Sequence, residues 1–361
     1  MLSKMAQRPE FGNAITRRHF IAQVSYATLA ASWQAAPQRP LARFEFAEPY
    51  MGTMFKMVVY ARDSAAAGVA SRSAFERVAA LDHIMSDYAP DSELRQLCRT
   101  AGGPPVRVSS DLFRVFSAAQ DLSERSGGAF DISVGPVVQL WRRARRRHEL
   151  PDPDRLAAAL ELVGYRNIRL NAQARTAQLL KPGMMLDLGG IAKGDAADQA
   201  LQVLANHQIT VALVAAAGDI AVADPPPGGE GWRIGLEPFE SPASPPAEFV
   251  TLHGGAISTS GDSEQHVEIG GIRYSHIVNP KTGMALTGRR SITVVAPHGL
   301  IADPYATALC VMGPERGLEL VAGVPGAAAL VIEQNGDAPV RRYESCGFPP
   351  TTTLIGSADA Q

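Results

Sequence analysis

The chain has 361 residues, 46% of them hydrophobic and 19% charged, with a formal net charge of -2 at pH 7. This length suits one large globular unit or two modest domains with an ample core. The near-neutral charge argues against a nucleic-acid partner, which would require a clear basic excess. The three cysteines, Cys98, Cys310 and Cys346, lack C-x-x-C spacing, so the sequence indicates neither a zinc site nor a disulfide framework.

The N-terminal segment has the pattern of an export signal. Arg17 and Arg18 precede a mildly apolar run that ends in small residues, which is typical of the twin-arginine route. We therefore expect residues 1–36 to be a signal peptide, cleaved near Ala35 or Ala36 as the folded protein reaches the periplasm. The apolar run is too short and too polar for a confident membrane span. A disordered basic tail is the alternative.

The rest of the sequence alternates helical and extended patterns. Helices are predicted over residues 64–88, 110–127, 154–164, 193–208 and 302–312. Strands are predicted over 50–61, 211–223, 232–236, 249–258, 266–271, 273–278, 291–297 and 328–334, with a strand pair within 167–190. Hairpin-like pairs dominate the second half, which favours an α+β fold with mixed or mostly antiparallel sheets packed with helices.

One dense charge run, RRARRRH, covers residues 142–148. A phosphate-binding patch is one interpretation, but no aromatic residue interleaves with the run. We favour a solvated, exposed insertion, because such runs are usually flexible or exposed. It would still attract an acidic partner.

The motif LDLGGIAKGDAAD, residues 186–198, places a Gly-Gly turn before Lys193 and a helix. Glycines let backbone approach a ligand, and the free N–H groups of a helix start attract phosphate. The motif matches neither a P-loop nor a dinucleotide fingerprint. A structural turn with an exposed lysine accounts for it equally well.

The motif GGAFDISVGPVVQLW, residues 127–141, follows a glycine pair. Phe130 is suited to covering a flat ring system, and Asp131 to bonding a ring nitrogen or a hydroxyl. The alternative, equally good from this motif alone, is the end of a helix followed by a core strand.

Two further motifs carry polar side chains. In ADPYATAL, Asp303 and Thr307 stand four residues apart, on one face of a helix. Their oxygens suit Mg²⁺, which shares ligands with substrate phosphates, although an aspartate at a helix start also stabilises the helix amides. In SHIVNPKTG, residues 275–283, His276 precedes an Asn-Pro turn. This histidine either takes part in the reaction or packs against the turn. Together these motifs predict phosphoryl or nucleotidyl chemistry on a metal-bound pyrophosphate.

The order of these motifs resembles the ApbE family of FAD:protein FMN transferases. The resemblance also includes MGT at 51–53, MSDYAPDSEL at 85–94 and ISTSG at 257–261. It extends over residues 44–335 and implies an ApbE-like fold, with residues 336–361 as a C-terminal tail.

The resemblance implies an exported, Mg²⁺-dependent enzyme that splits FAD and attaches FMN by a phosphoester bond to a threonine or serine of a flavoprotein, releasing AMP. It implies FAD contacts at Met51, Tyr88, Ala129, Phe130, Asp131, Lys193 and Ile277. The implied metal ligands are Asp303, Thr307 and the backbone carbonyl of Ala196, and His276 is the implied catalytic residue. The implied acceptor is a periplasm-facing subunit of a membrane electron-transfer complex, so association with the inner membrane is also expected. An FAD pyrophosphatase and a non-catalytic periplasmic flavin-binding protein are the alternatives.

Several positions depart from the family pattern, among them Ser263, where tyrosine is frequent, Lys281, where arginine is common, and Ala216. Asp195 stands where an aromatic residue is usual, Ala217 where glycine is usual and Asn279 where aspartate is common. None of them removes His276 or an implied metal ligand.

Overall fold

The computed structural model describes residues 40–239, 244–262, 265–334, 336 and 338–353. The predicted signal peptide therefore lies outside the described residues.

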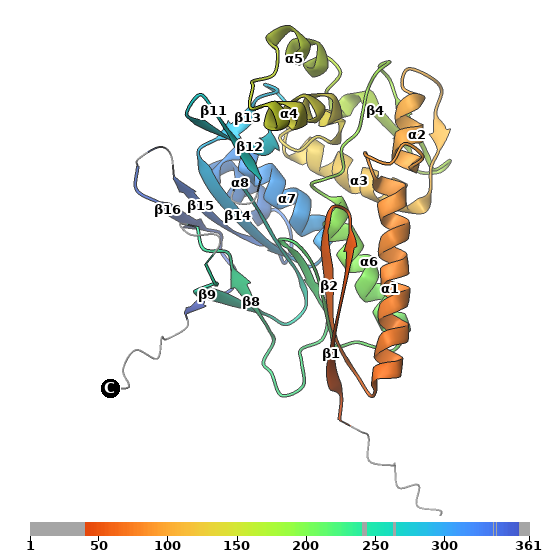
Figure 1. Cartoon of the computed structure of the whole chain (residues 1–361), viewed down its shortest axis with the longest axis vertical. Helices are drawn as coiled ribbons and strands as arrows, with labels where there is room; N and C mark the ends of the chain where they lie inside the picture. Colours follow the sequence, from red (N-terminus) through yellow and green to blue (C-terminus); the bar gives the residue numbers. More distant parts are fainter. Residues whose placement is uncertain (1–39, 240–243, 263–264, 335, 337, 354–361) are drawn as a thin grey trace, which may run out of the picture. The chain divides into compact units, whose positions relative to one another are not determined.

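The centre of the fold is an antiparallel sheet, which has eight strands within the described residues, in the order β1-β2-β6-β7-β10-β14-β15-β16 (Figure 1). In this order the strands span Ala42–Tyr50, Thr53–Ala61, Ala212–Ala216, Asp219–Val222, Gly255–Gly261, Arg289–Ala296, Ala328–Gln334 and Arg341–Glu344. Every neighbouring pair is antiparallel. The predicted α+β class with mostly antiparallel sheets is confirmed.

The two faces of this sheet pack against different partners because side chains alternate along each strand. In β2, Phe55 and Met57 belong to the main core, while Val58 and Tyr60 pack in a second apolar cluster on the opposite face. The main core is shared with several helices, among them α1 (Ser64–Met85), α6 (Ala192–Asn206) and α7 (Gly299–Met312). The second cluster is shared with a small sheet of β8 (Trp232–Leu236), β9 (Glu248–Leu252) and β17 (Thr352–Thr353).

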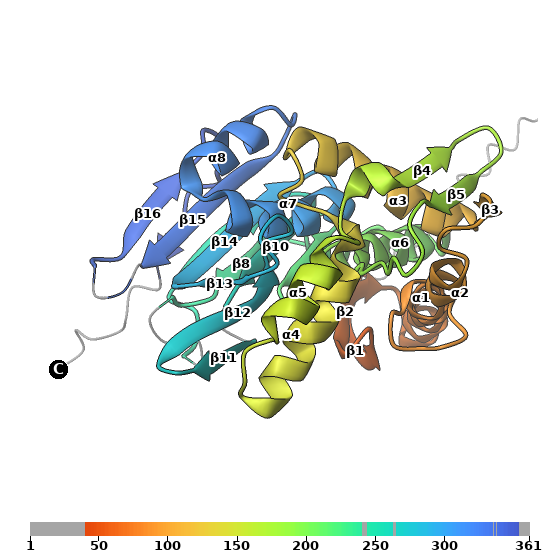
Figure 2. The same cartoon turned by 90° about the horizontal axis from the view of Figure 1, so that it is seen from above.

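The remaining elements surround this centre (Figure 2). Around the main core lie α2 (Glu93–Arg99), α3 (Ser110–Arg125), α8 (Pro314–Ala322) and a sheet of β3 (Val106–Arg107), β5 (Thr176–Leu179) and β4 (Ile168–Asn171). A separate group combines α4 (Gly135–Arg147) and α5 (Pro153–Leu160) with a sheet of β11 (His266–Ile269), β12 (Ile272–Val278) and β13 (Ala285–Thr287).

Residues 142–148 are not an insertion, because α4 contains most of this run, although Arg143, Arg146, Arg147 and His148 are exposed as expected. Pro136 lies at the start of α4, where it costs no hydrogen bond. Val137, Trp141 and Ala144 recur at helical spacing and are buried on one side. Arginine is also a good helix former, so the run continues the helix rather than interrupting it. The alternative of a core strand after the glycine pair fails for the same reason.

Two segments outside the sequence-predicted elements extend the large sheet. Residues 42–50 form β1, joined to β2 by a turn in which Met51 and Gly52 have φ of 50° and 73°. Two consecutive positive φ values fit the type I′ turn, whose twist matches a hairpin. Residues 336–361, assigned to a tail, contribute β16 to the sheet edge and β17 to the small sheet.

Helices α6 and α7 cross at backbone contact because both carry a glycine at the crossing. A Cβ atom added to Gly194 would lie 2.2 Å from the carbonyl oxygen of Gly299, and one added to Gly299 would lie 2.4 Å from that of Gly194. This crossing brings Asp303, on α7, to the start of α6, where its Oδ2 accepts a hydrogen bond of 3.1 Å from the amide of Gly194.

We expect Gly194→Ala to lower the free energy of unfolding by about 3 kcal/mol, since its methyl group overlaps backbone that cannot move aside. Urea unfolding measures the loss. The matched control is Gly68→Ala in α1, where nothing lies within 4 Å. That change should leave stability equal or raise it by up to about 1 kcal/mol. Equal stability of the two variants would show that the crossing is not tight.

Candidate active site

Lys193 lies at the start of α6 between two carboxylates from other elements. Its Nζ is 2.6 Å from Oδ2 of Asp219, the first residue of β7, and 3.8 Å from Oδ2 of Asp303. The same Nζ lies 3.5 Å from the carbonyl oxygen of Gly189 in the Gly-Gly turn. The ammonium group is thus placed at the helix start, where the sequence predicts anion binding.

Asp219 did not stand out from the sequence, although it pairs most closely with Lys193. Its Oδ1 accepts a 2.5 Å hydrogen bond from Ser258 Oγ of the neighbouring strand β10. Both side chains are buried. The only sequence signal was the turn Ala217-Gly218 before β7, where Ala217 has a φ of 54°. This alanine, at a position where the resemblance implies glycine, adopts the left-handed conformation that glycine prefers.

The carboxylate of Asp303 is buried and lies close to the charged groups of Asp219 and Lys193. Burial and the nearby charge of Asp219 raise its pKa to about 7, against the lowering effects of Lys193 and the Gly194 amide. Thr307 lies one turn further along α7. A Cβ atom on Gly190 would lie 2.9 Å from its Oγ1, so the threonine packs against the Gly-Gly turn.

Three kinds of oxygen atom are available here as metal ligands: the carboxylate of Asp303, the hydroxyl of Thr307 and the carbonyls of the Gly-Gly turn. No group of three or more His, Cys, Asp or Glu side chains in the described part of the chain could hold a metal alone. A small set of hard oxygen donors suits Mg²⁺, which keeps waters and takes substrate oxygens as further ligands. The residues therefore fit a magnesium ion shared with a phosphate.

The structure does not favour the carbonyl of Ala196 as a metal ligand. Ala196 is inside α6 with no exposed surface, and a helical carbonyl already accepts from the amide four residues later. The Gly189–Gly190 turn contacts Thr307 and Lys193, so one of its carbonyls is a candidate for the role.

His276 is half-buried on β12, and a backbone carbonyl fixes the orientation of its ring. Its Nδ1 lies 3.1 Å from the carbonyl oxygen of Gln265. Since a carbonyl only accepts, Nδ1 carries the proton, and the lone pair is on Nε2. Burial lowers the pKa of His276 to about 4, and the positive charges of Arg145 and Lys193 act in the same direction, against the raising effect of the Gln265 bond. The ring is therefore neutral at pH 7, with one nitrogen able to accept a proton.

Tyr88 and Arg142 lie against each other, a pairing that the sequence did not predict. We call these two side chains the rim. Tyr88 is 76% exposed, and the Arg142 guanidinium lies 4.5 Å from its ring centre. Arg142 also donates to Asp87 and, at 2.8 Å, to Asp187. Asp187 accepts from the amide of Gly189 at 2.8 Å, so this rim is tied directly to the Gly-Gly turn. An exposed aromatic ring here is available to a flat ligand.

Residues 129–131 are less accessible than predicted. Phe130 is 5% exposed and belongs to the main core, so it is not a free lid over a ring system. The Asp131 carboxylate accepts from the amide and hydroxyl of Ser133 and from the amide of Tyr165, at 2.6–2.8 Å. It caps a short helix, and only small surfaces of Ala129 and Asp131 remain for ligand contact.

Met51 and Ile277, the other predicted FAD contacts, lie in different elements. Met51 is in the β1–β2 turn, where its amide donates to Asp82 Oδ2 at 3.0 Å. Ile277 follows His276 on β12 and is 7% exposed. Asn279 accepts from the amide of Lys281 through Oδ1 at 2.9 Å and thereby supports the turn after the histidine strand, a bond that the common aspartate could also accept.

Asp195 anchors the start of α6 to a neighbouring helix. Its carboxylate is 1% exposed and accepts two bonds from Arg114 of α3, at 2.9 and 2.8 Å. Arg114 also binds Asp111, which pairs with Arg77 of α1. The network links α1, α3 and the first turn of α6, which carries Lys193.

We expect Asp195→Ala to lower the free energy of unfolding by about 2–4 kcal/mol, because it leaves Arg114 partly buried without its main partner. Chemical denaturation measures the change. Asp121→Ala is the control, since that carboxylate is 69% exposed and 3.8 Å from Arg125. It should cost less than about 0.5 kcal/mol. A similar loss in both variants would contradict the anchoring role.

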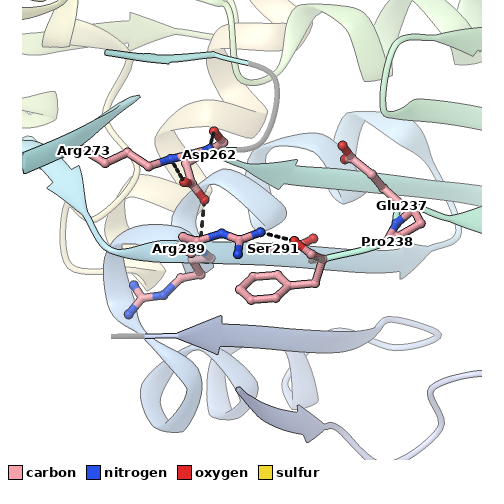
Figure 3. Close-up of a pocket in the computed structure, with 8 residues that line it drawn as sticks. Glu237, Pro238, Asp262, Arg273, Arg289 and Ser291 are labelled. Atoms are coloured by element: carbon pink, nitrogen blue, oxygen red, sulfur yellow. Dashed lines mark hydrogen bonds and ion pairs between the residues drawn. The ribbon is translucent and has the colours of Figure 1, made fainter. Parts of the chain in front are cut away.

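A small pocket beside β12 and β14 contains none of the predicted FAD contacts (Figure 3). Its polar groups bind one another: Asp262 is 2.6 Å from Arg273 and accepts from the amide of Arg290 at 2.9 Å. Arg289 donates to the carbonyl of Phe239 and lies over its ring. The charges of Asp262 and Arg273 therefore offset each other within this pocket.

Comparison with known proteins gives concordant matches. The model of the ApbE family matches residues 51–331. A Treponema pallidum protein named FAD:protein FMN transferase is 35% identical over 301 residues, covering 79% of this chain and 83% of that protein. A Haemophilus influenzae protein of the same name is 32% identical over 292 residues, covering 78% and 84%. The solved structure of the flavin transferase ApbE from Vibrio cholerae matches with a TM-score of 0.76 and 29% identity, covering 85% of this chain and 98% of that chain.

Proposed function

The chain belongs to the ApbE family, and we propose that it is an FAD:protein FMN transferase that modifies a threonine or serine of another protein. The observation that carries the proposal is the meeting of Lys193, Asp303 and Thr307 at one Gly-Gly turn. The charge of Lys193 also reaches His276, which has a free Nε2. Phosphoryl transfer needs this combination of charge neutralisation and positioning more than covalent help from the protein.

In the proposed reaction, the acceptor oxygen attacks the phosphorus on the FMN side of the FAD pyrophosphate. One P–O bond forms, the P–O bond to AMP breaks, and the hydroxyl proton passes to Nε2 of His276. Lys193 turns from Asp219 toward the pyrophosphate and offsets its charge. Met51, Tyr88 and Ile277 contact the rest of FAD, with Ala129, Phe130 and Asp131 contributing from the buried loop.

Asp303, Thr307 and a carbonyl of the Gly-Gly turn would hold Mg²⁺. The ion would supply positive charge that stabilises the AMP leaving group. The buried Asp303 carboxylate, with its raised pKa and its neighbour Asp219, is a setting that a cation would stabilise.

We further propose that the enzyme works in the periplasm, on a periplasm-facing domain of a membrane electron-transfer subunit. The support is the twin-arginine pattern at residues 16–20 and the family's use of a protein acceptor. Within the described residues, no helix is long and apolar enough to span a membrane.

The test incubates purified protein with FAD, Mg²⁺ and candidate acceptor domains, and reads products by intact mass spectrometry and nucleotide chromatography. A transferase gives AMP together with an acceptor heavier by FMN less one water. FMN and AMP with an unmodified acceptor would indicate a pyrophosphatase, and bound but unbroken FAD would indicate a binding protein. Either of these results with a proven family acceptor would refute the proposal.

A further inference from the structure

The second half of α4 carries an arginine face. Five arginines occur in the six residues 142–147. Arg142 is engaged by Asp87 and Asp187, whereas Arg143, Arg146 and Arg147 are exposed. No ion pair joins these three to a carboxylate in the part of the chain that the structure describes. The face is strongly positive although the whole chain is nearly neutral.

This helix is fixed against the sheet that contains His276 (Figures 1 and 2). The ring of Trp141 packs against Tyr274 of β12 with 5.2 Å between centres, and its Nε1 donates to the carbonyl of Gly283 at 2.7 Å. Val137 and Ala144 are buried in the same cluster. The arginine charges are therefore presented by a rigid element beside the histidine strand.

Arg145 connects the face to His276. It is half-buried, one turn after Trp141, and donates to Oε1 of Gln265 at 3.2 Å. The carbonyl of the same Gln265 holds Nδ1 of His276. Burial and the neighbouring charges of Arg142 and Arg146 lower the pKa of Arg145, while Tyr88 and Asp187 act in the opposite direction.

We propose that Arg143, Arg145, Arg146 and Arg147 dock an acidic segment of the acceptor protein and guide its hydroxyl to His276. This inference rests on the proposed transferase function. To lose its proton to Nε2, the hydroxyl must come within about 3 Å of it, which brings its flanking residues alongside α4. Carboxylates in those residues would complement the face and speed encounter.

Neither the helix dipole nor an anionic membrane accounts for the whole arginine face. Basic residues favour the C-terminal end of a helix through its dipole, but the dipole gives no reason for Arg145 to share a partner with the histidine. An anionic membrane would meet Arg143, Arg146 and Arg147, yet a flat surface does not reach a half-buried Arg145. A flexible polypeptide segment can contact the exposed arginines and also reach Arg145.

The test compares two synthetic peptides with the same central threonine, one flanked by Asp and Glu and the other by Asn and Gln. FMN transfer is measured for the wild type, for R143Q/R146Q/R147Q and for R62Q/R72Q/R316Q. The last variant removes the same charge from exposed arginines outside α4. Wild type and control should prefer the acidic peptide by about tenfold or more in kcat/KM at low ionic strength, and salt should weaken that preference.

The α4 triple variant should lose the preference while binding FAD as tightly as the wild type. Equal use of both peptides by the wild type, or an unchanged preference in the α4 variant, would overturn the docking proposal alone. Transfer to neither peptide would remove the transferase premise, and both proposals would fall. If the α4 variant kept the peptide preference but lost binding to phosphatidylserine vesicles, the face would be assigned to lipid instead.

Discussion

Replacing Asp303 by asparagine is expected to lower the rate of FMN transfer by roughly 10³-fold or more at saturating Mg²⁺. A bound metal ion would supply several kcal/mol of charge stabilisation, and each 1.36 kcal/mol is about tenfold in rate. Asparagine keeps an oxygen for the amide of Gly194, which now donates to Oδ2 at 3.1 Å, but it loses the charge that would bind the ion. Single-turnover transfer to an acceptor, followed by intact mass, measures the effect.

Stability measurements separate this loss of function from misfolding. Burial and Asp219 raise the pKa of Asp303 to about 7. Because this carboxyl has a raised pKa, the ion-free folded protein loses stability as pH rises from about 3.9, the ordinary pKa of aspartate, to the folded value. Without Mg²⁺ at pH 8, Asp303→Asn should therefore melt at the same temperature as the wild type or higher. Added Mg²⁺ should stabilise the wild type but not the variant. A variant that melts far lower would have lost activity through unfolding, against the expected result.

Thr307 provides a graded comparison at the same site. Thr307→Ser keeps the hydroxyl that packs on the Gly-Gly turn and should retain most activity. Thr307→Val nearly preserves the side-chain size but removes the hydroxyl, so it should raise the Mg²⁺ concentration needed for half-maximal transfer. A Mg²⁺ titration of the transfer rate measures both variants. Full activity of the valine variant at low Mg²⁺ would contradict the role of the hydroxyl.

The fold class followed from sequence because strand alternation and helical spacing are local patterns. Phe55, Met57 and Val59 in β2 show that alternation directly, and all three are buried in the main core. α4 was missed because its apolar positions are sparse and its arginines resemble an exposed run. The tertiary contact of Trp141 with Tyr274 shows that the run continues a packed helix.

The site was predictable only in part, for a similar reason. Lys193, Asp303 and Thr307 stand in recognisable motifs, and the structure places them at one turn. Asp219 and Arg142 act through partners distant in sequence, which no local pattern contains. Asp131 shows the converse: its motif suggested ligand binding, yet its carboxylate is occupied by a cap. Motifs indicate the turn that we propose to bind an anion, but the ion pairs around it depend on the assembled fold.

His276→Asn is expected to reduce FMN transfer by about 10²–10⁴-fold, the usual contribution of a general base, while FAD binding stays unchanged. The asparagine amide nitrogen takes the place of Nδ1 and can still donate to the carbonyl of Gln265, so the local structure is kept. It offers no basic nitrogen in place of Nε2. Single-turnover transfer and FAD titration measure the two properties separately, and wild-type transfer rates in this variant would exclude the role.

The pH dependence gives a second, independent measurement of the same residue. Because the pKa of His276 is lowered to about 4, its neutral form, which is the base, predominates at all higher pH values. The acid limb of kcat/KM for the acceptor should therefore fall near pH 4, rather than near the ordinary histidine value of about 6.5. Saturating Mg²⁺ would favour the ionised form of Asp303 during the measurement. In His276→Asn the limb should disappear while the remaining slow rate stays level, since the group whose protonation stops the reaction is gone. A limb near pH 6.5 would mean that acceptor or substrate binding exposes the ring, and a limb that persists in the variant would assign it to another group.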